Sequence, residues 1–120
     1  MKNLLKFCSI AEILTALALI FIPAIITQLL IGAELNDIAL LLTRFSGICL
    51  LSLGIACWPN QETVQASWAM LLYNILVTIF FIYIGLNQTR VGILLWPGSV
   101  LHFVLAVLLI RGLLVEKKSR

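Results

Sequence analysis

Charged residues are scarce in this 120-residue chain, at 11% of the sequence, whereas hydrophobic residues make up 62%. An ordinary soluble domain carries about 25% charged residues. A soluble four-helix bundle also needs a polar outer face on every helix, and no long apolar stretch of this sequence has one. The shortage of charge therefore excludes an ordinary soluble fold.

Cysteine is also sparse, and Cys8, Cys49 and Cys57 all lie within apolar stretches. They show neither CxxC spacing nor alternation with histidine, so the sequence indicates no zinc site and no disulfide framework. We interpret them as small apolar residues that fill space between helices. The sequence predicts no metal, no cofactor and no catalytic site.

Four long apolar stretches fill most of the chain. Each is long enough to cross a hydrocarbon core of ~30 Å, which needs ~20 apolar residues. The connections are short, so consecutive helices must be antiparallel neighbours. The sequence therefore predicts an all-α integral membrane protein, one up-down-up-down bundle of four transmembrane helices over residues 1–120. The predicted spans are Leu4–Leu30, Ile38–Trp58, Val64–Leu86 and Val91–Leu113.

Proline predicts irregularities in two of these spans. The first span has 27 residues and would be ~40 Å long as one helix. It must therefore tilt, bend at Pro23 or project beyond the bilayer. Pro97 is expected to kink the last span near its outer end, because it removes a backbone donor and crowds the preceding turn.

Most of the basic residues gather near the two ends of the chain. Six of the eight flank the first and last spans: Lys2, Lys6, Arg111, Lys117, Lys118 and Arg120. Cytoplasmic segments beside membrane spans carry an excess of lysine and arginine. The sequence therefore predicts a multi-pass protein of the bacterial inner (plasma) membrane with both termini cytoplasmic. Its tail, Glu116–Arg120, is placed to contact lipid headgroups, so the predicted partner is membrane lipid rather than nucleic acid.

Three polar residues inside the spans share one depth. At ~1.5 Å per residue, Glu12 lies ~12 Å above the inner boundary, Asn74 ~15 Å and His102 ~14 Å. Polar groups in a membrane are costly and face the bundle interior, where they find partners. We expect Glu12, Asn74 and His102 to form an intramembrane polar cluster.

Arg44 lies elsewhere, only ~9 Å below the outer start of its span at Ile38. Helical side chains lean toward the N-terminus of their helix, which for Arg44 is the outer side. We therefore expect this outer-leaflet charge to be directed toward Asp37 and the outer surface rather than to pair with Glu12.

Small residues mark the predicted helix contacts, because they let backbones approach closely in lipid. Gly47 and Gly54 are seven residues apart in the second span, on the same side as Arg44. Ser99 and Ala106 mark the inward side of the fourth span, together with His102.

The polar cluster admits several functions. It could fix the bundle through interhelical hydrogen bonds, each worth ~0.6–2 kcal/mol. A buried carboxylate beside a histidine could instead handle protons or ions. A pocket for a quinone-like lipophilic ligand is a further possibility, and haem ligation by His102 would supply only one axial ligand.

Two family resemblances bear on this choice. The glutamate in CSIAEILTAL (8–17), in a four-span chain of this size, resembles the small multidrug resistance transporters, whose usual second- and third-span patterns are not recognisable here. A broader resemblance, to small DoxX-like bacterial four-span proteins, covers most of the chain. It is carried by AEILTALAL (11–19), IGAEL (31–35), RFSGICLLSLGIACWPN (44–60) and GILLWPGSVLH (92–102).

The DoxX-like resemblance implies an inner-membrane protein, and DoxX relatives are associated with quinone-linked sulfur oxidation. This chain has no redox centre to support that activity. The sequence as a whole favours an accessory or interaction protein without catalysis of its own, in a homodimer or a larger membrane complex. The alternative is a proton-coupled small-molecule carrier that uses Glu12 and His102.

Overall fold

The computed structural model describes residues 1–60 and 63–119, and all regular structure among them is helical. Arg120, part of the predicted basic tail, lies outside the described residues. The all-α prediction is confirmed. The described helices are α1 (Lys2–Phe21), α2 (Pro23–Ile31), α3 (Asp37–Ala56), α4 (Thr63–Asn87) and α5 (Leu95–Ser119).

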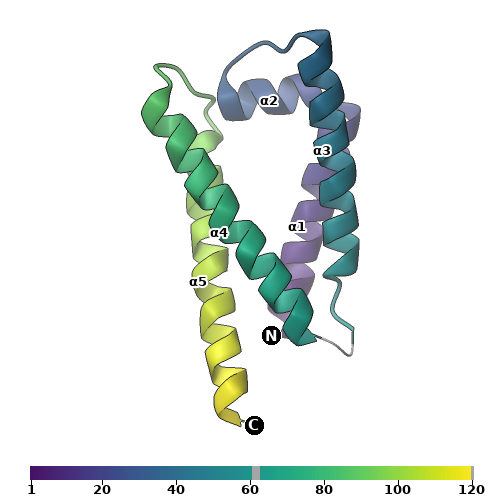
Figure 1. Cartoon of the computed structure of the whole chain (residues 1–120), viewed down its shortest axis with the longest axis vertical. Coiled ribbons are helices and arrows are strands. Elements are labelled where there is room, and N and C mark those ends of the chain that lie inside the picture. The colour runs from purple at the N-terminus through teal and green to yellow at the C-terminus, as the bar shows by residue number, and fades with distance from the viewer. Residues whose placement is uncertain (61–62, 120) are drawn as a thin grey trace.

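The long helices form two tightly packed antiparallel pairs, α1 with α3 and α4 with α5 (Figure 1). Helix α1 also contacts α4 and α5, but less extensively than it contacts α3. Both termini lie at the same end of the molecule, and short α2 runs across the opposite end. The architecture is therefore two helical hairpins joined at both ends, rather than an evenly closed ring of four helices.

The predicted first span is not one continuous helix, because the chain turns at Pro23. Ile22 has φ −130° and ψ 51°, outside the helical region, and Pro23 then opens α2. A proline in the first turn of a helix costs nothing, since its absent N–H would be unpaired there. The Thr27 hydroxyl donates to the Pro23 carbonyl oxygen at 2.7 Å. Of the three outcomes expected for this long stretch, the structure has the bend.

The end of α2 is fastened to the segment that leads into α5. The backbone N–H of Gly92 donates to the Leu30 carbonyl at 3.2 Å, and that of Leu94 donates to the Leu29 carbonyl at 2.8 Å. A Cβ at position 92 would collide with the Leu29 carbonyl, so only glycine allows this approach. Gly32, at φ 75°, ends α2 in the left-handed conformation, as glycine does after many helices.

The kink predicted at Pro97 is absent, because the last helix begins later than expected. Helix α5 starts at Leu95 rather than at Val91, so Pro97 lies in its first turn. There the proline interrupts no helical hydrogen bond. The N–H of Gly98 makes the next bond, to the Leu94 carbonyl at 2.8 Å.

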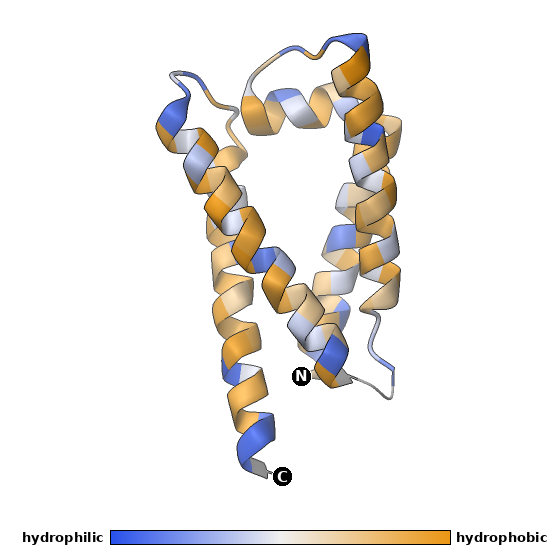
Figure 2. Ribbon diagram, in the orientation of Figure 1, coloured by the Kyte–Doolittle hydropathy of each residue, from blue (hydrophilic) through white to orange (hydrophobic). Residues whose placement is uncertain are grey.

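Most residues of the long helices are hydrophobic (Figure 2), and many of their large apolar side chains are exposed. Among the described residues, α1, α3, α4 and α5 are each long and apolar enough to cross a membrane. The buried apolar core lies nearer the end that holds both termini. Its members are Leu5, Cys8, Cys57, Met70, Leu71, Leu105, Ala106 and Leu109. Two of the three cysteines therefore fill space between helices, whereas Cys49 is exposed.

Candidate functional site

A group of polar side chains lies where α1 meets the α4–α5 pair. Helix α4 contributes Tyr73 and Asn74, α5 contributes His102, and α1 contributes Glu12. Asn74 is completely buried and Glu12 is 2% exposed, while Tyr73 and His102 are half-buried. We call these four residues the polar cluster.

Asn74 and His102 join α4 to α5 through a hydrogen bond of 2.8 Å between Oδ1 and Nδ1. Asn74 Nδ2 donates to the Met70 carbonyl of its own helix, also at 2.8 Å. That bond fixes the orientation of the amide, so the oxygen faces the histidine. An amide oxygen can only accept a hydrogen bond. His102 Nδ1 therefore carries a hydrogen, and in the neutral ring Nε2 is left as an acceptor.

Glu12 and Tyr73 join the two helix pairs. The Tyr73 hydroxyl donates a hydrogen bond to the Glu12 carboxylate, and this contact connects α1 to α4. A buried tyrosine usually places its hydroxyl against a partner, and a buried carboxylate is costly without one. The Tyr73 hydroxyl therefore gains an acceptor, and the Glu12 carboxylate gains a donor.

Two aromatic rings of α4 enclose the imidazole of His102. The Tyr73 ring lies edge-on to it, with centroids 5.7 Å apart and an angle of 80° between the planes. The Phe81 ring makes the same kind of contact at 5.8 Å and 80°. Tyr73 thus contacts both Glu12 and His102, and links the carboxylate to the imidazole without a direct bond between them.

The structure brings the predicted residues together in a different arrangement from the one expected. Asn74 pairs with His102, as their common depth suggested. Glu12 pairs with Tyr73, and no hydrogen bond joins it to His102 among the described residues. Tyr73 was not among the residues predicted from the sequence. A signal was present, because Tyr73 lies mid-helix, whereas Tyr83, Trp58, Trp68 and Trp96 lie near helix ends, where aromatic belts form.

Arg44 lies apart from the polar cluster, on the exposed side of α3. In residues 1–60 and 63–119, no ion pair links it to Glu12 or to Asp37. The expected direction of its side chain, toward Asp37 and the outer surface and away from Glu12, stays a prediction. Arg44 also does not share the buried side of Gly47 and Gly54. Asp37 lies in the first turn of α3, where a negative charge stabilises the helix dipole.

The predicted small residues lie in helix contacts. A Cβ at Gly47 would come within 2.9 Å of the Ala16 carbonyl oxygen, and one at Gly54 within 3.2 Å of the Ser9 carbonyl oxygen. Both glycines therefore let α3 approach the backbone of α1. On α5, Ser99 and Ala106 are each 5% exposed, and Ala106 belongs to the apolar core.

The polar cluster lines neither of two pockets that lie at opposite ends of the molecule. One pocket lies between the start of α4 and the end of α5. The other, at the opposite end, is formed by Ile31–Ala33 and Asn87–Arg90. Among the described residues, no group of three or more histidine, cysteine or acidic side chains could hold a metal ion.

Comparisons with family models, with curated proteins and with solved structures found no match to this chain.

Proposed function

We propose that this chain is a multi-pass membrane protein that acts as an accessory or interaction protein, without a catalytic site of its own. The observation that carries the proposal is the polar cluster, in which Glu12 and Asn74 are buried. Its four polar groups are satisfied mainly by one another, and it lines neither pocket. Such a cluster serves best as a device that fixes the two helix pairs against each other.

The test is to purify the protein together with the proteins bound to it. A tagged chain, extracted from its own membrane in mild detergent, should co-purify with a second protein in a stoichiometric complex or as a homodimer. The variant Glu12→Gln, which keeps an acceptor for Tyr73, should retain that complex. A chain that is monomeric in detergent after covalent cross-linking in intact membranes would contradict the proposal.

A second candidate is a proton-coupled small-molecule carrier, and one observation favours it. Glu12 and His102 both contact Tyr73, so a carboxyl, a phenol and an imidazole follow one another across the boundary between the helix pairs. Groups of this kind form proton relays in membrane proteins. A relay needs water at one end at least, and neither of the two pockets described above is lined by the polar cluster.

Proton flux into liposomes separates the two candidates. The protein is reconstituted in liposomes that contain a pH-sensitive dye. If it is an accessory protein, the liposome lumen should acidify no faster than that of empty liposomes. A carrier would instead acidify the lumen when an outward substrate gradient is imposed. That flux would be abolished by Glu12→Gln and by Tyr73→Phe, while the folded fraction of each variant stays unchanged.

A quinone-like ligand is the third candidate, in keeping with the DoxX-like resemblance. The acceptor Nε2 of His102 has no hydrogen-bond partner among the described residues, and a quinol hydroxyl could donate to it. Titration with a water-soluble quinol should shift the ring-proton resonances of His102 if the ligand binds there. Unchanged resonances at saturating quinol would remove this candidate.

The proposed location is the bacterial inner membrane with both termini in the cytoplasm. The basic terminal segments support it, and both termini share one end of the molecule. Reporter fusions should place the C-terminus inside and the connection 32–36 outside. A periplasmic C-terminus would contradict this orientation.

A further inference from the structure

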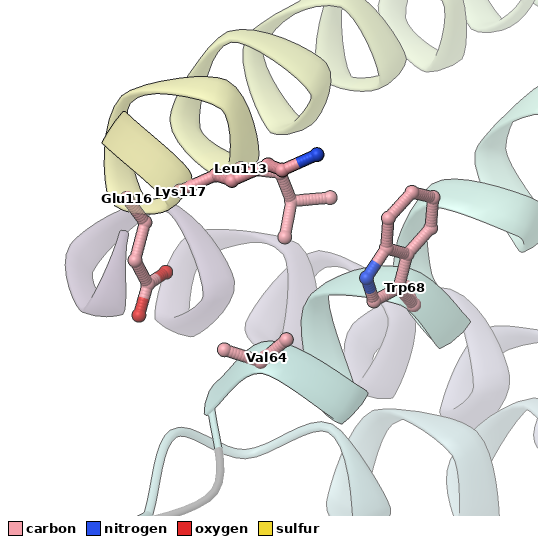
Figure 3. Close-up of a pocket in the computed structure, with 5 residues that line it drawn as sticks. All are labelled: Val64, Trp68, Leu113, Glu116 and Lys117. Carbon is pink, nitrogen blue, oxygen red and sulfur yellow. The ribbon is translucent and has the colours of Figure 1, made fainter. Parts of the chain in front are cut away.

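A pocket of about 210 Å³ lies between the start of α4 and the end of α5, at the end of the molecule where both termini lie. Figure 3 shows its lining residues gathered around one space. The polar cluster contributes none of them, so the pocket is a separate feature of the molecule. The lining residues are Val64 and Trp68 from α4 and Leu113, Glu116 and Lys117 from α5.

The lining offers two hydrogen-bond donors that have no partner among the described residues. One is the ammonium of Lys117, and the other is the indole N–H of Trp68, a residue that is 59% exposed. Neither group can accept a hydrogen bond. In Figure 3 the Lys117 side chain extends toward Trp68, and the indole nitrogen faces the other lining residues. A ligand that complements this pair must therefore supply acceptor oxygens.

The one acidic residue of the lining is not available to a ligand. Glu116 already interacts within the described structure, and its carboxylate points away from Trp68 (Figure 3). Its charge offsets that of Lys117 within the lining. The start of α4 and the end of α5 add partial charges of opposite sign, which also offset each other. The sign of the charge that the pocket attracts therefore depends on the residues around it.

Basic residues dominate this end of the molecule. Among the described residues it carries five basic side chains, against the one acidic side chain of Glu116. Glu62 and Arg120, which have opposite charges, lie outside the described residues. Clusters of lysine and arginine beside a membrane span attract anionic lipid headgroups. This end therefore favours a ligand of net negative charge. The five basic residues are Lys2 and Lys6 from α1 and Arg111, Lys117 and Lys118 from α5.

The position of the pocket limits where such a ligand comes from. The apolar sequence of α5 ends at Val115, just before the polar tail. In the membrane orientation proposed above, on which this inference rests, the pocket lies at the depth of the inner headgroups, where tryptophan is enriched. The pocket is smaller than the ~300 Å³ of typical drug-sized sites. It therefore takes the phosphate and glycerol of a lipid rather than the whole molecule.

We propose that this pocket binds the phosphodiester of an anionic phospholipid, as in phosphatidylglycerol. The phosphate oxygens accept hydrogen bonds from the Lys117 ammonium and the Trp68 indole. The glycerol and the upper acyl carbons continue along Val64 and Leu113. A zwitterionic lipid offers the same phosphate, but the basic residues of this end repel its cationic group.

The test uses Trp68 as the reporter. Trp58→Phe combined with Trp96→Phe leaves it as the single tryptophan, and the protein is reconstituted in phosphatidylcholine vesicles. A fixed fraction of the lipid is then replaced by acyl-brominated phosphatidylglycerol or by acyl-brominated phosphatidylcholine, whose bromine atoms quench a nearby tryptophan. We expect phosphatidylglycerol to associate with Trp68 about threefold more strongly, the size of a partly exposed ion pair.

Two adjacent lysines separate a defined site from a general attraction to the basic end. Lys117→Gln should remove most of the preference. Lys118→Gln removes the same charge from the same tail, but Lys118 lies outside the pocket lining, so the preference should remain. Circular dichroism checks that each variant stays helical. Equal losses in the two variants would overturn the site, because they would show that the lipid responds only to the total charge.

Native mass spectrometry measures the contribution of the indole N–H without the reporter. The chain is offered equal amounts of phosphatidylglycerol and phosphatidylcholine, and phosphatidylglycerol adducts should dominate. Trp68→Phe keeps an aromatic ring but loses the donor, so it should lower the share of these adducts. Trp58→Phe, a change beside Lys6 and outside the lining, should leave the share unchanged. Equal shares in both variants would overturn the assignment of the phosphate to this pair of donors.

Inorganic phosphate carries the same acceptor oxygens without an apolar part. Added in excess at constant ionic strength, it should leave the quenching of Trp68 by phosphatidylglycerol unchanged. Release of the lipid by inorganic phosphate would overturn the lipid assignment in favour of a free anion. Protein that fails to float with vesicles in a density gradient would instead overturn the membrane assignment on which the inference rests. Protein that floats, but whose Trp68 shows no preference between the two lipids, would overturn only this site.

Discussion

The two helix pairs are held together by different means. Helices α1 and α3 contact through Gly47 and Gly54, whose Cα atoms lie against the backbone of α1. Helices α4 and α5 meet through the hydrogen bond between Asn74 and His102 and through aromatic side chains. In that second pair, glycine faces side chains, as Gly85 faces the ring of Trp96.

This difference shows how each pair tolerates change. A contact between backbones cannot relax around an added side chain, because a main chain cannot rotate out of the way. A contact between an aromatic ring and a glycine can adjust by small rotations of the ring. The α1–α3 pair should therefore be sensitive to size, and the α4–α5 pair to the loss of polar partners.

The largest effect is expected from Gly47→Val combined with Gly54→Val. Each added side chain would meet the α1 backbone, and overpacking of this kind costs about 1–3 kcal/mol per site. We expect the free energy of unfolding, measured by SDS titration in mixed micelles, to fall by about 4 kcal/mol.

Gly112→Val is the matched control for that double variant. A Cβ there meets only the end of the Met1 side chain, which can move away. The free energy of unfolding should therefore change little. Equal losses in the control and in the double variant would show that α1 and α3 do not depend on close backbone approach.

The next largest effect concerns the joint between the pairs. Glu12→Leu leaves the Tyr73 hydroxyl without its acceptor and should cost about 1–3 kcal/mol. Adding Tyr73→Phe should recover part of the lost stability, because it removes the hydroxyl that has no acceptor. Glu12→Gln keeps an acceptor and should stay close to the unmodified chain.

The sequence alone had grouped Glu12 with His102 and Asn74. In the structure the residue bonded to Glu12 is Tyr73, so adding His102→Leu should give simple additivity. Coupling of Glu12 to His102 but not to Tyr73, in the two double-mutant cycles, would contradict the arrangement described here.

Features that depend on neighbouring residues could be predicted from the sequence, whereas contacts between distant segments could not. Helix type and the four apolar helices were predictable, because length and composition are local properties of the chain. The bend at Pro23 was foreseen as one outcome, whereas the crossing of α2 over the end of the molecule was not. That crossing depends on hydrogen bonds from Gly92 and Leu94 to carbonyls about sixty residues earlier, which no local pattern encodes.

The candidate site was predictable to the same extent. Depth along a helix follows from residue number, and it brought Asn74 and His102 to one level. The rotation of a helix about its own axis does not follow from residue number. That rotation decides which of two adjacent residues faces α1. Tyr73 faces Glu12, while the adjacent Asn74 faces α5. The identity of the partner therefore needed the structure.

A smaller effect is expected within the α4–α5 pair. Asn74→Leu and His102→Leu each remove one side of the 2.8 Å bond, and their double-mutant cycle should give a coupling of about 0.6–1.7 kcal/mol. Thr78→Val is the control, because the Thr78 hydroxyl donates only to the Asn74 carbonyl of its own helix. A coupling near zero would mean that the aromatic contacts alone hold this pair.

The smallest effect is expected at Arg44, which belongs to neither kind of contact. Its side chain is exposed and makes no ion pair with Asp37 or Glu12 among the described residues. Arg44→Gln removes the charge and keeps most of the aliphatic stem, so the free energy of unfolding should change by less than about 0.5 kcal/mol. The matched change Arg111→Gln, at the exposed end of α5, should behave alike. A loss above about 1 kcal/mol at Arg44 alone would mean that the outer side of α3 has a partner. In that case the α1–α3 pair would depend on polar contacts as the α4–α5 pair does, and the contrast between them would fail.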